Sequence, residues 1–265
     1  MTTLLWLTLP YVAFTSFVLG HLWRYRHDQF GWTTRSSQLY ESRLLRLGSP
    51  LFHFGLLAVI GGHVMGLLVP AAVTEFLGVS EHFYHLMSVS MGTLSGTATL
   101  AGLGILLYRR ATVSAVRQAT TRMDKLMYLL LAAAMGTGMG NTVGANLLGL
   151  GLSPEQIGPA GGYNYRETVS PWFRGLFTLS PEPALMAGVP LIYQAHALVV
   201  LCLLALWPYT RLVHVFSAPL GYLTRPYVIY RSKESHPAAS RYAKAWVTPP
   251  PATPSPTVRM GRGPR

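Results

Sequence analysis

Five long apolar stretches alternate with shorter polar connections along this chain. A helix needs about 20 apolar residues to cross the hydrocarbon core of a bilayer. The pattern therefore predicts five transmembrane helices, at Leu4–Trp23, Pro50–Pro70, Leu86–Tyr108, Leu126–Leu150 and Ala184–Trp207. We expect an all-α integral membrane protein built as a bundle of five transmembrane helices.

The basic residues are distributed very unevenly among the connections. Of the 21 Lys and Arg residues, only Arg166 and Arg174 lie in the connections after the second and fourth apolar stretches. The positive-inside rule then places the N-terminus outside and the C-terminus in the cytoplasm. The net charge of +12 thus reflects topology rather than nucleic-acid binding, although basic loops can also contact anionic lipid or an acidic partner. Only 11% of the residues are charged, against about 25% in soluble domains.

The remaining segments have patterns of their own. The first apolar stretch is expected to be retained, because no basic residue precedes it and Trp23 and Arg24 end it. In the long connection before the fifth stretch, the aromatic run Pro171–Phe177 predicts a short helix in the outer membrane interface. After Lys233 the chain is rich in Pro, Ala, Ser and Thr. We therefore expect a membrane domain over 1–233 and a disordered cytoplasmic tail over 234–265.

Four of the nine histidines lie within or at the ends of apolar stretches. His53 and His63 lie on the second stretch and His196 and His214 on the fifth. An ionisable residue in a membrane is costly and indicates a function. The structural alternative is a neutral histidine hydrogen-bonded to a neighbouring helix.

The spacing of these histidines predicts two pairs. His53 and His63 are ten residues apart, or ~15 Å along a helix. His196 and His214 are eighteen residues apart, which is five whole turns of a continuous helix, so both are expected on one face. Because the two helices run in opposite directions, His63 is expected to face His196 near the outer surface. His53 is expected to face His214 near the inner surface.

Each pair predicts a bis-histidine haem site, with the four histidines as axial ligands of two haem irons. Two imidazoles without a nearby carboxylate or thiolate do not complete a tetrahedral zinc site. They do complete a six-coordinate haem iron suited to electron transfer. The single cysteine, Cys202, excludes an iron–sulfur cluster held by this chain, since a cluster needs about four thiolates.

Several residues near the histidines can serve haem binding or the structure of the bundle. Arg211 lies one turn before His214 and can pair with a haem propionate or act as a positive-inside anchor. Pro208 is expected to kink the fifth helix between its two ligands. Four glycines can let a macrocycle approach the backbone or can serve ordinary helix packing: Gly55, Gly61, Gly62 and Gly66.

Seven short motifs accompany the histidine spacings. In chain order they are Trp23-Arg-Tyr-Arg26, Ser36-Ser-Gln38, Leu51-Phe-His-Phe-Gly55, Gly62-His63, Arg-Gln-Ala-Thr-Thr over 117–121, Arg211-Leu-Val-His214 and Tyr222-Leu-Thr-Arg225. Over about residues 5–233 the chain resembles the gamma, or cytochrome b, subunit family of membrane-bound respiratory nitrate reductases.

The resemblance implies a five-helix anchor with two haems b, distal at His63 and His196 and proximal at His53 and His214. It also implies quinol oxidation near the outer haem, and docking onto an iron–sulfur (beta) subunit that serves a molybdenum (alpha) subunit reducing nitrate. Members of the family often carry a lysine just before the third span to contact the quinol. This chain instead has Glu81-His-Phe-Tyr-His85 there. His82 or His85 can accept the quinol proton, or both can be solvated loop histidines.

The sequence thus predicts a multi-pass subunit of a prokaryotic cytoplasmic membrane. A lipid quinol, menaquinol or ubiquinol, binds beside the outer pair, where Gly62 allows close approach of its ring. The cytoplasmic segment Tyr222–Tyr230 is expected to contact the iron–sulfur partner. The alternatives are a quinone-linked cytochrome b of a sulfite or heterodisulfide reductase, a structural anchor, or a proton-coupled transporter. Only the glycine- and asparagine-containing run Gly136–Asn146 favours the transporter.

Overall fold

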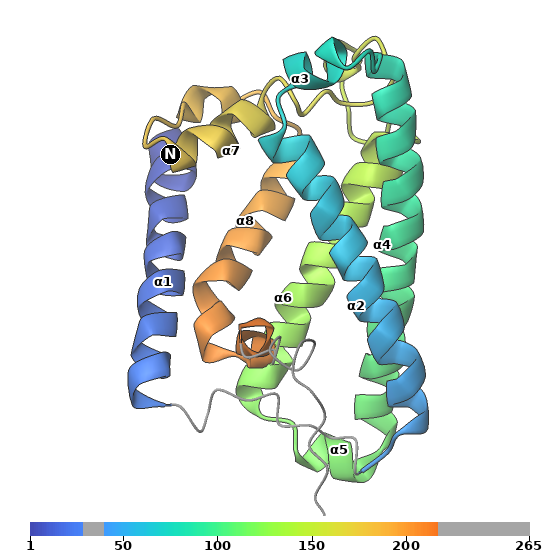
Figure 1. The fold of residues 1–265 in the computed structure, drawn as a ribbon, viewed down its shortest axis with the longest axis vertical. Coiled ribbons are helices and arrows are strands. Elements are labelled where there is room, and N and C mark those ends of the chain that lie inside the picture. The colour runs from blue at the N-terminus through green and yellow to red at the C-terminus, as the bar shows by residue number, and fades with distance from the viewer. Residues whose placement is uncertain (29–39, 217–265) are drawn as a thin grey trace, which may run out of the picture. The chain divides into compact units, whose positions relative to one another are not determined.

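The structure, a computed structural model, describes residues 1–28 and 40–216 (Figure 1). Within these ranges every regular element is helical and no strand occurs. Five segments are long and apolar enough to cross a membrane: Leu4–His27, Arg43–Leu68, Glu81–Thr112, Arg122–Ala145 and Leu191–Tyr209. The expectation of an all-α chain with five such helices is therefore confirmed. The proposed tail, Ser36–Gln38 and Tyr222–Tyr230 lie outside the described residues.

Long helices alternate in direction and are joined by short helical segments (Figure 1). The elements are η1 (Leu4–Thr8), α1 (Leu9–His27), α2 (Arg43–His63), η2 (Val64–Leu68), α3 (Ala71–Phe76), α4 (Glu81–Thr112), α5 (Ser114–Gln118), α6 (Arg122–Met139), η3 (Gly140–Ala145), η4 (Pro154–Gln156), α7 (Val169–Phe177), η5 (Pro183–Met186), α8 (Leu191–Leu206), η6 (Trp207–Tyr209) and η7 (Arg211–Val215). Figure 1 places α3 and α7 at the end of the bundle where α1 begins, and α5 at the other end.

Several helices begin earlier than their apolar stretches predict, because the capping residues are polar. The Ser80 hydroxyl accepts a hydrogen bond from the Phe83 N–H at 3.3 Å, so α4 begins at Glu81. Thr121 and Asp124 form a capping box that starts α6 at Arg122. The fifth helix is shorter than expected, because Pro190 precedes its first residue, Leu191. Apolar length therefore locates the spans but not their termini.

The two longest helices, α2 and α4, pack side by side (Figure 1). Gly102 faces the α2 backbone so closely that an added Cβ would lie 2.7 Å from Phe52 Cα. Gly55 faces α4 in the same way, where an added Cβ would lie 2.8 Å from Thr99 N. Small residues on both helices thus let the two backbones approach.

We expect Gly102→Ala to destabilise the protein, because its methyl group must push α2 away from α4. Overpacking of this kind typically costs about 1–3 kcal/mol. The matched control is Gly104→Ala on the same helix, where an added Cβ would meet no heavy atom within 4 Å. In thermal unfolding of the detergent-solubilised protein, Gly102→Ala should lower Tm and Gly104→Ala should leave it unchanged or raise it. Equal effects of the two substitutions would contradict this account of the interface.

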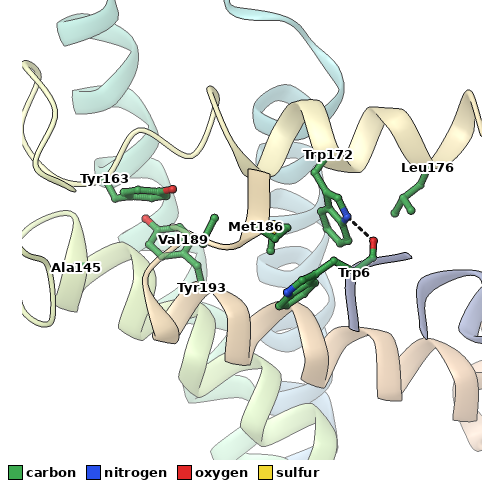
Figure 2. Close-up of a cluster of buried hydrophobic side chains, with 8 residues drawn as sticks. All are labelled: Trp6, Ala145, Tyr163, Trp172, Leu176, Met186, Val189 and Tyr193. Carbon is green, nitrogen blue, oxygen red and sulfur yellow. Dashed lines mark hydrogen bonds between the residues drawn. The ribbon is translucent and has the colours of Figure 1, made fainter. Parts of the chain in front are cut away.

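A buried hydrophobic cluster joins η1, α7 and α8 at the end of the bundle where α1 begins (Figure 2). The Trp172 indole N–H donates to the Trp6 carbonyl at 2.7 Å, and the two rings meet edge to face with centres 5.6 Å apart. Met186 is fully buried beside them. The short helix predicted at Pro171–Phe177 is thus present as α7 (Val169–Phe177), and its tryptophan is part of this core.

Candidate functional site

Both histidine pairs expected from the sequence are brought together. The ring centres of His63 and His196 are 6.0 Å apart, with 33° between the ring planes. The ring centres of His53 and His214 are also 6.0 Å apart, with 73° between the planes. An imidazole nitrogen lies about 2 Å from a metal ion that it binds, so two imidazoles on opposite sides of one ion have ring centres about 6 Å apart. The spacing of each pair therefore fits an ion held between two rings.

The second ring nitrogen of each histidine is already engaged. The Nδ1–H groups of three of them donate to backbone carbonyls one turn earlier in the chain: His53 to Ser49 at 2.7 Å, His63 to Val59 at 2.8 Å, and His214 to Arg211 at 2.7 Å. A metal-binding histidine usually donates its other N–H in this way, which fixes the tautomer and the ring orientation. In this arrangement Nε2 is the ring nitrogen that would bind a metal.

His196 is held from a neighbouring helix rather than from its own. Its Nδ1 lies 3.0 Å from the Thr137 hydroxyl oxygen on α6. That hydroxyl donates its own hydrogen to the Ala133 carbonyl at 2.7 Å, so the His196 N–H is the donor in the first bond. An added Cβ at Gly138 would lie 3.2 Å from His196 Cε1, so glycine leaves room for the ring. The run Gly136–Asn146, considered above as a sign of a transporter, thus supplies residues that position His196.

The expectation that His196 and His214 share one face of a continuous helix is wrong. Helix α8 ends at Leu206, and Pro208 lies in the short 3₁₀ segment η6 that follows. Thr210 is extended, with φ −112° and ψ −179°, before η7 begins at Arg211. His214 therefore reaches His53 from a separate short helix. Proline lacks the N–H needed to continue α8, and for this reason the count of whole turns fails.

A buried ion pair attaches η7 to α6. The Arg211 guanidinium donates to both carboxylate oxygens of Asp124, at 2.6 and 2.8 Å. The same carboxylate accepts the Thr121 N–H at 2.9 Å in the capping box of α6. The Arg211 carbonyl in turn accepts the His214 Nδ1–H. The pairing of Arg211 with a haem propionate stays a prediction. In the structure its guanidinium contacts Asp124 and also the Ala119 carbonyl, at 3.3 Å.

The four glycines near the histidines divide into two groups. An added Cβ at Gly55 or Gly66 would collide with Thr99 or Tyr165, so these two serve packing. An added Cβ at Gly61 or Gly62 would meet no heavy atom within 4 Å. The second group therefore leaves space beside His63, as a flat macrocycle or a quinol ring would require. The role of Gly62 in quinol approach stays a prediction.

The two histidines suggested as proton acceptors lie at the start of α4. His82 is exposed, and His85 is half-buried next to Gly162 in the long connection. Among the described residues neither makes a hydrogen bond to His63 or His196. Their role stays a prediction.

In residues 1–28 and 40–216, no three His, Cys, Asp or Glu side chains gather to form a metal site. Each pair thus offers two nitrogen ligands from this part of the chain. A structural zinc ion takes four ligands, whereas a haem supplies four of its own and needs two from the protein. The donor set and the ring spacing therefore fit haem better than zinc.

Comparisons with known proteins agree with this chemistry. The family model described as nitrate reductase gamma subunit matches residues 2–233. The nitrate reductase gamma chain of Bacillus subtilis is 46% identical over 230 residues, which cover 87% of this chain and 98% of that protein. The respiratory nitrate reductase 2 gamma chain of Escherichia coli is 33% identical over 84% of this chain and 94% of its own length.

A further similar protein is much longer than this chain. The nitrate reductase-like protein NarX of Mycobacterium tuberculosis is 56% identical over 234 residues, which are 88% of this chain. Those residues are 34% of NarX, so the chain spans about a third of the length of that relative.

Proposed function

Since the chain belongs to the nitrate reductase gamma subunit family, we propose that it is the membrane cytochrome b subunit of a quinol-oxidising nitrate reductase. The observation that carries the proposal is the presence of two histidine pairs with ring centres 6.0 Å apart, one formed between α2 and α8 and the other between α2 and η7. The first pair is His63 with His196, and the second is His53 with His214.

In this proposal each pair holds one haem b through Nε2. The bound haems would supply reversible one-electron chemistry, which suits transfer from the outer to the inner side. The chain's own residues orient the imidazoles through the Nδ1 hydrogen bonds. Each site offers two imidazole nitrogens to the iron, one from each histidine. His53 and His63 lie on one helix, ten residues or ~15 Å apart, so the two sites are held at a fixed separation.

The outer pair is the proposed point of entry for electrons. A lipid quinol, menaquinol or ubiquinol, would bind beside His63, where Gly61 and Gly62 leave space. Its oxidation releases two protons and two electrons. His82 and His85 are the candidate proton acceptors, because an imidazole can take up a proton and both lie in the first turns of α4. The protons would then leave on the outer side.

The inner pair is the proposed point of exit. The uneven distribution of Lys and Arg favours an outer N-terminus and a cytoplasmic C-terminus in a prokaryotic cytoplasmic membrane. An iron–sulfur subunit docked on the cytoplasmic face would accept the electrons, and a molybdenum subunit would reduce nitrate. Family membership favours this reading over the sulfite or heterodisulfide reductase alternative. The contacts of Thr137 and Gly138 with His196 remove the main argument for a transporter.

The test is a reduced-minus-oxidised spectrum with redox titration of membranes that contain the protein with its partner subunits. We expect two low-spin b-type components, both reducible by a quinol analogue. Moving an electron inward against a membrane potential costs ~2.3 kcal/mol per 100 mV, so the component of higher potential is expected at the inner pair. A protein that binds no haem under these conditions would overturn the proposal and restore the transporter alternative.

A further inference from the structure

The long connection between α6 and α8 contacts the end of the helical segment that carries His53 and His63. Three of its side chains donate to carbonyls at the end of η2, the continuation of α2 beyond His63. The Ser170 hydroxyl donates to the Gly66 carbonyl at 2.9 Å, and Arg174 Nη1 donates to the Leu67 carbonyl at 3.1 Å. Arg166 Nη2 lies 3.4 Å from the Val69 carbonyl.

These carbonyls need partners from outside the helix. The last turn of any helix leaves its carbonyl groups without intrahelical donors. The segment η2 is wound as a π-helix and stops at Leu68, where Val69 becomes extended. Arginine guanidinium groups are favourable there, since the C-terminal end of a helix carries partial negative charge. Both basic residues of the outer connection, Arg166 and Arg174, thus donate to carbonyls at the C-terminal end of η2.

The donors themselves are held firmly. Ser170 is fully buried, and the Arg166 guanidinium lies over the Tyr84 ring with 3.9 Å between its carbon and the ring centre. Burial also raises the pKa of the neighbouring Tyr165 phenol well above its usual range, an effect that Tyr84 reinforces. The Tyr165 ring packs against Gly66.

The same connection is anchored to η1 and to α1, which carry Trp6 and Tyr11 respectively. The Trp172 indole donates to the Trp6 carbonyl at 2.7 Å, and the Tyr11 hydroxyl donates to the Leu176 carbonyl at 3.2 Å. Figure 2 shows Trp172 on α7 directed at Trp6. Helix α7 is thus fixed to α1 through one set of side chains and to η2 through another.

From these contacts we propose that the outer connection is a clamp that sets the position of His63 opposite His196, with Ser170 and Arg174 as its positioning residues. The inference rests on the proposed role of this pair as ligands of the outer haem. His63 is three residues before Gly66, so loosening of η2 lets the His63 ring rotate away from its partner. The clamp does not touch the inner pair, whose geometry depends on Asp124 and Arg211.

The test compares Ser170→Ala, Arg174→Met and the conservative Arg174→Lys in the full complex. Ser170→Ala and Arg174→Met are expected to shift the electron paramagnetic resonance signal and midpoint potential of the outer haem. The signals of the inner haem should stay as in the wild type. Arg174→Lys, which can still donate a hydrogen bond, should restore much of the outer signal. The matched control is Glu155→Gln on the same connection, where the carboxylate is exposed.

Hydrogen–deuterium exchange supplies a readout that does not depend on haem. Faster exchange of the amides over 64–69 in Ser170→Ala and Arg174→Met, but not in Glu155→Gln, would support the clamp. Unchanged exchange there, or equal shifts of both haem signals, would overturn it. A third outcome separates the two proposals. If the wild-type protein binds no haem, but Ser170→Ala and Arg174→Met still speed exchange over 64–69, the proposed function is overturned and the contact of the clamp with η2 is supported.

Discussion

The variant His63→Ala is expected to lose the outer haem and, with it, quinol-driven reduction of the inner haem. Alanine offers no ligand to the metal, and His196 alone provides one nitrogen. Loss of an outer partner of a ligand already costs about 10–100-fold in metal affinity or activity, so we expect loss of the ligand itself to lower quinol oxidation by more than about 100-fold. Reduction of the inner haem by dithionite, which needs no quinol, should persist.

The two pairs can be distinguished by which of the two haem signals each variant loses. The variant His53→Ala should lose the inner haem and keep quinol-driven reduction of the outer one. His27→Ala is the control, since His27 lies on the exposed last turn of α1 and should leave both components unchanged. If His63→Ala and His53→Ala lost the same spectral component, the assignment of two separate pairs would be wrong.

The second large effect is expected at the ion pair that attaches η7 to α6. The Arg211 and Asp124 side chains are 17% and 5% exposed and 2.6 Å apart. Removing one partner of a buried pair typically costs about 3–5 kcal/mol, because the other charge is left without compensation. Asp124→Ala is therefore expected to lower Tm and to release η7, so that the inner haem is lost while the outer one is retained.

An ion pair whose carboxylate is exposed is the control for this experiment. Arg24 lies on α1 and Asp28 directly follows this helix, and their side chains are 11% and 42% exposed. Pairs four residues apart contribute about 0.3–0.5 kcal/mol, and Arg24 keeps its hydrogen bond to the Pro208 carbonyl at 2.7 Å. Asp28→Ala is therefore expected to change Tm little. Thermal unfolding together with haem spectra measures both effects. Retention of the inner haem in Asp124→Ala would show that η7 is held by other contacts.

The number and the approximate positions of the helices could be predicted because a bilayer imposes a minimum apolar length. The pairing of His53 with His214 and of His63 with His196 could be predicted from topology, since helices that cross in opposite directions bring their inner and outer residues together. Helix termini could not be read in this way. They are determined by local hydrogen bonds of Ser80 and Thr121 and by the missing N–H donor of Pro190. A search for long apolar stretches does not take such residues into account.

The contacts that orient the histidines were not predictable from the chain alone. Thr137 and Ser170 are small polar residues whose partners lie 59 and 104 positions away. No local pattern distinguishes them from other threonines and serines. The sequence predicts a kink at Pro208, but it does not indicate the extended Thr210 or the new helix that follows. The first residue of that helix, Arg211, is bonded to Asp124, which lies 87 positions away.

Placing two paired histidines on one unbroken helix also limits how this chain can change over evolution. Each residue of an α-helix turns the next side chain by about 100° and advances it by ~1.5 Å. A single insertion or deletion between His53 and His63 would therefore turn one imidazole away from its partner while leaving the other in place. Even the insertion of a whole turn would restore the direction of the ring but move it by ~5.4 Å along the helix axis. We therefore expect chains that keep both pairs to keep the interval of ten residues between these two histidines.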